Sequence, residues 1–84
     1  MTQSVFSPDY DRFRSLLVDA RKKRNLTQVE LARRLDRPQS YVSKYERGER
    51  RLDVVEFLQI ARALNIDAGE FMKTLEGNDS ARRK

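Results

Sequence analysis

The sequence predicts an all-α fold of five helices in a single domain, and two observations support this. Apolar residues recur at the three-, four- and seven-residue spacing of a buried helix face, and three of these stretches begin with a capping pattern. Residues that stop a helix or tolerate a left-handed backbone separate the stretches: Asn25, Asp36, Gly48 and Gly77. We therefore expect one domain at residues 9–76, with a flexible arm at residues 1–8 and a mobile polar tail at residues 77–84.

The first helix is expected from about Tyr10 to Arg24, and the second between the cap residue Thr27 and Asp36. Thr27 and Glu30 have the spacing of a capping box, in which each side chain accepts a hydrogen bond from the other residue's backbone N–H. The apolar stripe of the first helix consists of Phe13, Leu16, Leu17 and Ala20. That of the second consists of Val29, Leu31, Ala32 and Leu35. Both stripes are expected to face the core.

A third helix, at residues 38–47, carries an unusual polar face. Pro38 suits the start of this helix and Gly48 ends it. One arc of the helix holds Tyr41, Val42, Tyr45 and Glu46, of which Val42 and Tyr45 are the expected core contacts. The opposite arc holds Gln39, Ser40, Ser43, Lys44 and Arg47. These amide, hydroxyl and cationic groups suit the base edges and phosphates of DNA, whereas the alternative interpretation is an ordinary solvated helix face.

Two further helices follow the same rules. Asp53 and Glu56 have the capping spacing for a fourth helix, whose inner face consists of Val54, Phe57, Leu58, Ala61 and Leu64. Asp67 and Glu70 repeat the pattern for a fifth helix, which Gly77 is expected to end. The apolar positions of the fifth helix are Ala68, Phe71, Met72 and Leu75.

The fifth helix is more apolar than the last helix of a small monomer requires. Closure of the domain's own core accounts for Phe71, but we expect Met72 or Leu75 to contribute to a twofold interface. Such a homodimer would present two copies of the third helix roughly 34 Å apart.

Two charged residues fall on apolar stripes. Arg21 follows Leu17 by four residues in the first helix, and Glu46 follows Val42 by four in the third. Because an isolated buried charge is costly, we predict an ion pair between Arg21 and Glu46. Its role is structural, and we do not expect Glu46 to act as a catalytic acid.

Two runs of sequence resemble the phage-repressor (Cro/cI, or Xre-type) helix-turn-helix family. They are L-T-Q-x-E-L-A-x-x-L at residues 26–35 and P-Q-S-x-V-S-K-Y-E-R-G at residues 38–48, and the likeness extends over roughly residues 13–64. It implies a compact, lambda-repressor-like bundle of five helices with the third as the recognition helix. Asp36 departs from the family, which usually has glycine at this turn. Positive φ is common there and costs Asp on the order of 1 kcal/mol.

The resemblance also implies roles for individual residues. Gln28 would contact a phosphate and brace the side chain of Gln39. The base-contacting positions would be Gln39, Ser40, Ser43 and Lys44. Arg47, with Arg50 or Arg51 in the following loop, would lie along the DNA backbone. Arg24, in the charged run at residues 21–24, is a further candidate for a phosphate contact.

The charge distribution agrees with a nucleic-acid partner. The formal net charge is +5, and residues 1–52 carry 13 Lys and Arg against 7 Asp and Glu. Residues 53–84 carry 5 Lys and Arg against 6 Asp and Glu. A basic part beside a near-neutral part fits a DNA-binding face opposite a partner-binding face.

Composition excludes several other classes. With no cysteine and no histidine, disulfides, ordinary zinc sites and histidine-based catalytic dyads are excluded, and we expect no metal and no cofactor. The sequence has no paired carboxylates on one face and no phosphate-binding glycine loop, so an enzyme is not expected. No apolar run approaches the roughly 20 residues needed to span a bilayer, so no membrane contact is expected and the location is cytoplasmic, with the nucleoid.

We therefore predict a sequence-specific regulator of transcription that binds double-stranded DNA, with repression as its effect. A DNA-binding antitoxin or a restriction–modification controller protein would share this chemistry and differ in partner. A protein-interaction module that retains the fold is a second class of alternative. RNA binding is less favoured because exposed aromatic residues for base stacking are lacking, Tyr10 being the obvious candidate.

Overall fold

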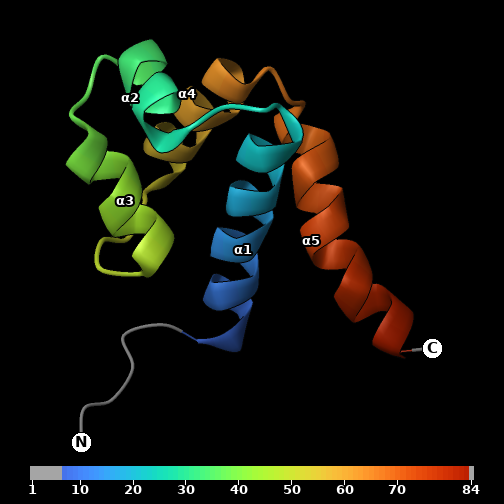
Figure 1. Cartoon of the computed structure of the whole chain (residues 1–84). Coiled ribbons are helices and arrows are strands. Elements are labelled where there is room, and N and C mark those ends of the chain that lie inside the picture. The colour runs from blue at the N-terminus through green and yellow to red at the C-terminus, as the bar shows by residue number, and fades with distance from the viewer. Residues whose placement is uncertain (1–6, 84) are drawn as a thin grey trace, which may run out of the picture.

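The computed structural model describes residues 7–83, and within them the chain forms five helices and no strand (Figure 1). In chain order these are α1 (Pro8–Lys23), α2 (Gln28–Leu35), α3 (Gln39–Arg47), α4 (Val54–Leu64) and α5 (Ala68–Arg83). The predicted all-α fold is confirmed. Most of the expected N-terminal arm, residues 1–6, lies outside the described part, as do the side chains beyond Gly77.

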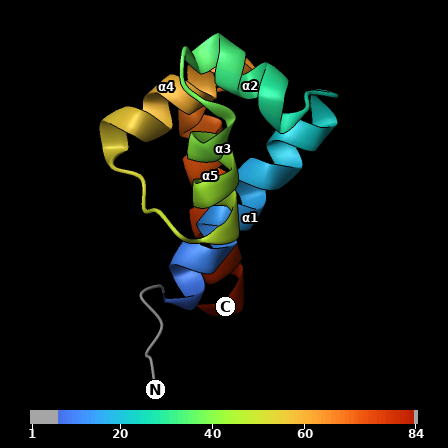
Figure 2. The ribbon, with the colours of Figure 1, turned by 60° about the vertical axis from the view of Figure 1, so that its left-hand side comes forward.

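The helices pack so that α3 and α5 occupy opposite sides of α1. In Figure 1, α1 lies between α3 and α5, and the turned view of Figure 2 brings α3 to the front with α5 behind it. α1 contacts both α3 and α5, while α2 contacts α3 and α4. The exposed surfaces of α3 and α5 therefore face different directions. None of the described helices is both long and apolar enough to span a bilayer.

The core joins all five helices. Its fully buried side chains are Tyr45, Leu17, Leu31, Ile60, Leu64 and Val42. Beside them Phe13, Phe57 and Phe71 form a cluster in which the ring centroids lie 5.1–5.8 Å apart. Aromatic rings at such separations attract one another beyond the effect of their buried area. This cluster connects α1, α4 and α5, and so closes the bundle.

The predicted caps explain most of the helix boundaries. The capping boxes of Thr27 with Glu30 and of Asp53 with Glu56 are both present. The Asp67 carboxylate accepts a hydrogen bond of 2.9 Å from the backbone N–H of Glu70 at the start of α5. α1 begins slightly earlier than expected, because the Ser7 hydroxyl caps it and Pro8 supplies the fixed φ that suits a first helical position.

The prediction that Gly77 ends the fifth helix was wrong, since α5 continues to Arg83. Gly77 is exposed, and a Cβ added there would meet no atom within 4 Å, so no packing forces the chain to turn. Glycine inside a helix costs only about 1 kcal/mol relative to alanine, which an otherwise regular helix tolerates.

Three residues expected in the core are exposed instead. Val29 is 43% exposed, Val54 72% and Leu58 41%. Leu58 is about 100° around α4 from the buried Phe57, and Val29 is about 200° around α2 from the buried Leu31. Both lie outside the arcs that the bundle covers, because a short helix buries only the narrow side that faces its neighbours.

Candidate nucleic-acid interface

α3 has one buried face and one polar, exposed face. Its buried residues are Tyr41, Val42, Tyr45 and Glu46, which include the predicted core contacts Val42 and Tyr45. On the other face Gln39, Ser40, Lys44 and Arg47 are exposed and Ser43 is partly exposed. The sole carboxylate of α3 belongs to Glu46, which is buried. The exposed face therefore offers neutral polar groups and cations, with no negative charge from its own helix to repel a phosphate.

The Arg21 and Glu46 side chains form the ion pair that was predicted between α1 and α3. Arg21 Nε donates to Glu46 Oε2 over 2.7 Å, and Nη2 donates to Oε1 over 3.0 Å. The two side chains are only 12% and 6% exposed. The hydrogen bond to the Glu46 carboxylate raises the pKa of Arg21 above its ordinary value, so the guanidinium stays charged.

Arg14 and Leu26 complete this junction. Arg14 Nη1 donates to the backbone carbonyl of Glu46 over 2.6 Å, and Arg21 Nη1 donates to the carbonyl of Leu26 over 2.8 Å. α1 is thus hydrogen-bonded both to the last turn of α3 and to the segment that precedes α2. These contacts fix the orientation of α3 on the bundle.

A sharp turn sets the angle between α2 and α3. Asp36 ends α2 with φ 59° and ψ 43°, in the left-handed region that the resemblance to the helix-turn-helix family implies for this position. The backbone N–H of Arg37 then donates to the carbonyl of Ala32 over 3.0 Å. Pro38, with φ −68°, leads directly into α3. The turn leaves Gln39 at the exposed start of α3.

Gln28, the first residue of α2, lies against the start of α3. Its Oε1 accepts a hydrogen bond of 3.3 Å from Gln39 Nε2, which is the bracing contact that the resemblance implies. Gln28 Nε2 also donates to Glu46 Oε1 over 2.8 Å, a contact that sequence reasoning missed. Gln28 therefore connects the exposed face of α3 with its buried carboxylate.

The arginines at the end of α3 and in the loop that follows are held in different ways. Arg47 makes two hydrogen bonds to the Glu49 carboxylate, of 2.9 and 3.0 Å, and both side chains are exposed. Arg50 makes two to Glu56, of 3.1 and 2.9 Å, and its guanidinium also lies 4.8 Å from the centre of the Tyr41 ring. Arg50 thus ties the loop to α4, a structural role that sequence reasoning did not assign to it.

Arg51 and Arg37 each lie over an aromatic ring. The Arg51 guanidinium is 4.4 Å from the centre of the Tyr10 ring, and that of Arg37 is 4.5 Å from the centre of the Tyr41 ring. The Tyr10 hydroxyl accepts a hydrogen bond from the backbone N–H of Leu52, so this aromatic residue supports the loop. Arg37 is an exposed cation next to the start of α3 that sequence reasoning missed. The one indication in the sequence was that Arg37 precedes Pro38, the residue expected to start the third helix.

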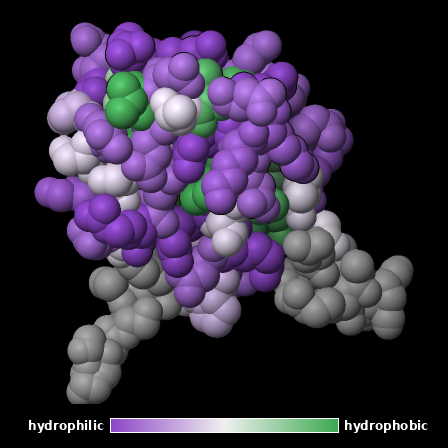
Figure 3. Space-filling model, in the orientation of Figure 1, coloured by the Kyte–Doolittle hydropathy of each residue, from purple (hydrophilic) through white to green (hydrophobic). Residues whose placement is uncertain are grey.

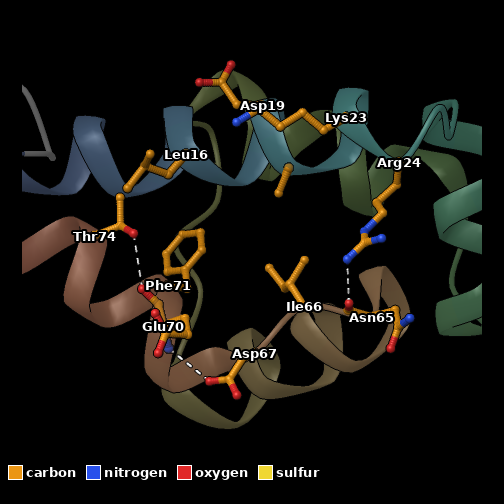
Figure 4. A pocket seen from close by; sticks show the side chains of 11 residues that line it. Leu16, Asp19, Lys23, Arg24, Asn65, Ile66, Asp67, Glu70, Phe71 and Thr74 are labelled. Atoms are coloured by element: carbon orange, nitrogen blue, oxygen red, sulfur yellow. Dashed lines mark hydrogen bonds between the residues drawn. The ribbon is translucent and has the colours of Figure 1, made fainter.

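Arg24 is hydrogen-bonded to the end of α4. Its Nη2 donates to the Asn65 carbonyl over 2.7 Å, at the C-terminal end of α4 (Figure 4). It lines a groove of about 470 Å³ between α1 and α5, with a floor that includes Leu16, Ile66 and Phe71. This hydrogen bond caps α4, and the expected phosphate contact of Arg24 stays a prediction.

Hydrophobic residues gather in a few places on the surface. Figure 3 shows a largely hydrophilic face, with small hydrophobic areas over α2 and along the junction of α1 and α5. A separate apolar groove of about 300 Å³ is lined by Val54, Leu58 and Met72 together with parts of the aromatic cluster. Met72 is 40% exposed, whereas Leu75 is half-buried. Among the described residues no three acidic side chains are grouped so that they could hold a metal ion.

Comparisons with known proteins agree with this geometry. The helix-turn-helix family model matches residues 17–71. The chain is similar to an XRE-family like protein from Pseudomonas syringae pv. tomato str. DC3000, with a TM-score of 0.80 and 46% sequence identity over 82% of this chain and 84% of that one. It is similar to the restriction-modification controller protein C.AhdI from Aeromonas hydrophila, with a TM-score of 0.69 and 34% identity over 77% of this chain and 98% of that one.

A third similar structure shows the fold alone. The restriction-modification controller protein C.Esp1396I, as a tetramer in complex with its natural 35 base-pair operator, has a TM-score of 0.78 and 22% identity over 86% of this chain and 95% of that one. Comparison with curated protein sequences gave no match.

Proposed function

Since the chain belongs to the XRE-type helix-turn-helix family of DNA-binding regulators, we propose that it is a sequence-specific repressor of transcription that inserts α3 into the major groove of double-stranded DNA. The observation that carries the proposal is the exposed face of α3, which presents Gln39, Ser40 and Lys44 while the opposite face is buried. The major groove is about 12 Å wide and admits a helix. This role places the protein in the cytoplasm with the chromosome, and it requires no enzymatic activity.

The residues on this face have distinct roles in the proposed complex. Gln39 pairs with adenine through its amide, and Lys44 donates to the acceptors of guanine. Ser40 and Ser43 contact neighbouring base edges or a phosphate, since a hydroxyl can both donate and accept. Together these four side chains determine the preferred sequence.

Other residues contact the DNA backbone and contribute affinity without sequence preference. Gln28 of α2 contacts the start of α3, Arg47 is the last residue of α3, and Arg51 lies in the loop that follows. Arg47 has to exchange its Glu49 partner for a phosphate, whereas Arg50 keeps its Glu56 partner and supports the loop. Arg37, next to the start of α3, is a further backbone contact.

We also propose that the protein acts as a homodimer, through the apolar surface that includes Val54, Leu58 and Met72. An exposed apolar groove of this kind is what an interface between subunits covers. Because α5 and α3 lie on opposite sides of α1, an interface that includes Met72 leaves both recognition helices free to contact DNA. Sedimentation that gives a monomer at high concentration, with and without DNA, would remove this part of the proposal.

A restriction–modification controller protein is the second candidate, favoured by the 34% identity to C.AhdI over 77% of the chain. It would use the same face of α3 and differ in the promoters that it controls. A reporter fused to a promoter that contains a DNA site bound by the protein distinguishes repression from activation.

The proposal is tested by measuring affinity for duplex DNA over a range of salt concentrations. Each phosphate that the protein neutralises is expected to contribute about −0.9 to the slope of log K against log salt concentration. A protein-interaction module with the same fold would bind duplex DNA weakly at every salt concentration. An affinity for duplex DNA that does not depend on salt would contradict the proposal.

A further inference from the structure

A chain of hydrogen bonds connects the buried carboxylate of Glu46 with the exposed amide of Gln39. Arg21 holds both carboxylate oxygens, and Oε1 also accepts from Gln28 Nε2 over 2.8 Å. Gln28 Oε1 then accepts from Gln39 Nε2 over 3.3 Å. The chain begins in the interior, where Glu46 is 8% exposed, and ends on the face of α3 proposed to contact bases.

Each step of this chain has a fixed direction. A carboxylate paired with a guanidinium is ionised and can only accept hydrogen bonds, so Gln28 has to turn its NH₂ group toward Glu46. The reverse orientation would place two acceptors against each other at a partly buried site, which is costly. With its NH₂ group committed, Gln28 presents its carbonyl oxygen to Gln39. Gln39 can meet that oxygen only with an N–H.

The direction of the chain determines what Gln39 offers to DNA. One N–H of Gln39 is used on Gln28, which leaves its carbonyl oxygen and its second N–H. Adenine presents one donor and one acceptor in the major groove, N6–H and N7, which match this pair. Guanine presents two acceptors, N7 and O6, which would need both N–H groups of the amide.

We propose that Glu46 is a positioning residue that, through Gln28, fixes the donor–acceptor polarity of Gln39 and so makes adenine preferred over guanine at the base pair that Gln39 contacts. The inference depends on the proposed function, because it assumes that Gln39 contacts a base. It assigns to the buried ion pair a second role, in specificity, besides its role in holding α1 against α3.

The test is selection of bound sequences from random duplex DNA, followed by affinity measurements with each base at one position. The base pair that Gln39 contacts is first identified as the one at which Gln39→Ala loses preference. At that position the wild type is expected to prefer adenine over guanine by about fivefold or more.

Gln28→Lys is the variant expected to reverse the orientation of the Gln39 amide. An ammonium has donors and no acceptor, so it can bind Glu46 but also forces Gln39 to turn its oxygen inward and its NH₂ group toward the DNA. The preference for adenine is expected to shift toward guanine. The added charge raises affinity for every duplex alike, so the ratio between bases isolates the effect of amide polarity. Gln28→Leu removes the constraint, and its preference is expected to be intermediate.

Glu46→Gln tests the first step directly, since an amide at that position can donate as well as accept. The preference of this variant for adenine over guanine is expected to fall to that of Gln28→Leu. Circular dichroism first shows that the variant is folded. The matched control is Glu56→Gln, which also breaks a bidentate pair with an arginine but lies outside the chain. This control is expected to retain the wild-type ratio.

The outcomes separate the two proposals. If the wild type enriches no sequence, the proposed function fails and the inference fails with it. If the wild type enriches a site but prefers guanine at the Gln39 position, or if Gln28→Lys keeps the preference for adenine, the proposed function stands and the positioning role is overturned. A shift of the same size in Glu56→Gln also overturns it, because general loosening would then explain the result.

Discussion

Replacing Glu46 with alanine tests how much the fold depends on the junction between α1 and α3. The carboxylate accepts three hydrogen bonds, two from Arg21 and one from Gln28, of 2.7, 3.0 and 2.8 Å. Without it Arg21, whose side chain is 12% exposed, keeps a largely buried charge with the Leu26 carbonyl as its one remaining hydrogen-bond partner among the described residues. Removing one member of a buried ion pair typically costs about 3–5 kcal/mol.

That cost is large for a chain of this size. At about 0.05–0.15 kcal/mol per residue the whole domain is stable by roughly 4–13 kcal/mol. Glu46→Ala is therefore expected to lower the free energy of unfolding, measured by urea denaturation, by about 3–5 kcal/mol. The melting temperature should fall by about 4–8 °C for each kcal/mol lost.

Two further variants serve as controls for this prediction. Glu49→Ala breaks a bidentate pair with Arg47 that has similar hydrogen-bond lengths but is exposed, so stability should hardly change. The double variant Arg21→Met with Glu46→Met replaces both charges by apolar groups and should recover most of the loss. If Glu46→Ala is no more destabilising than Glu49→Ala, the junction between α1 and α3 does not contribute the stability assigned to it.

Three other predictions concern binding and pH. Lys44→Ala should weaken binding to the preferred site by about 1–3 kcal/mol and leave non-specific binding unchanged, whereas Arg47→Ala should weaken both; equal losses on every sequence for both variants would contradict this division. Glu49→Gln should raise affinity for all duplexes by about two- to fivefold, because Arg47 no longer has to leave a carboxylate partner; an unchanged affinity in fluorescence anisotropy would count against Arg47 as a phosphate contact. The hydrogen bond from Arg50 holds the pKa of Glu56 below its usual 4.5, so the stability it contributes is complete above that pH and is lost as the pH falls through the lowered pKa. Thermal melts should show this loss on acidification, and a Glu56→Gln variant with an identical pH profile would exclude Glu56 as a source.

The parts of the fold that depend on local rules could be predicted from the sequence. The capping boxes at Thr27 and Asp53 and the left-handed turn at Asp36 are set by residues close to one another in the chain. The division of α3 into a buried and an exposed face follows from helix geometry. The pair between Arg21 and Glu46 could be predicted because each charge interrupts an apolar stripe.

Features that depend on neighbours distant in the sequence could not be predicted in the same way. Gln28 contacts Glu46 across 18 positions, and Arg24 contacts Asn65 across 41. The spacing of apolar residues along the chain does not predict such contacts, because they depend on how the helices pack. At Gly77 a local rule predicted a helix end that the structure does not have. Glycine often ends helices, but it does so only where packing or a cap supports the turn.

Whether the exposed face of α3 enters the major groove is tested by a nuclear magnetic resonance titration with the duplex selected from random DNA. The largest changes in backbone amide shifts are expected at Gln39, Ser40, Ser43 and Lys44, with smaller changes at Gln28 and Arg47. Changes confined to α4 and α5, with α3 unaffected at saturating DNA, would contradict the entry of α3 into the major groove.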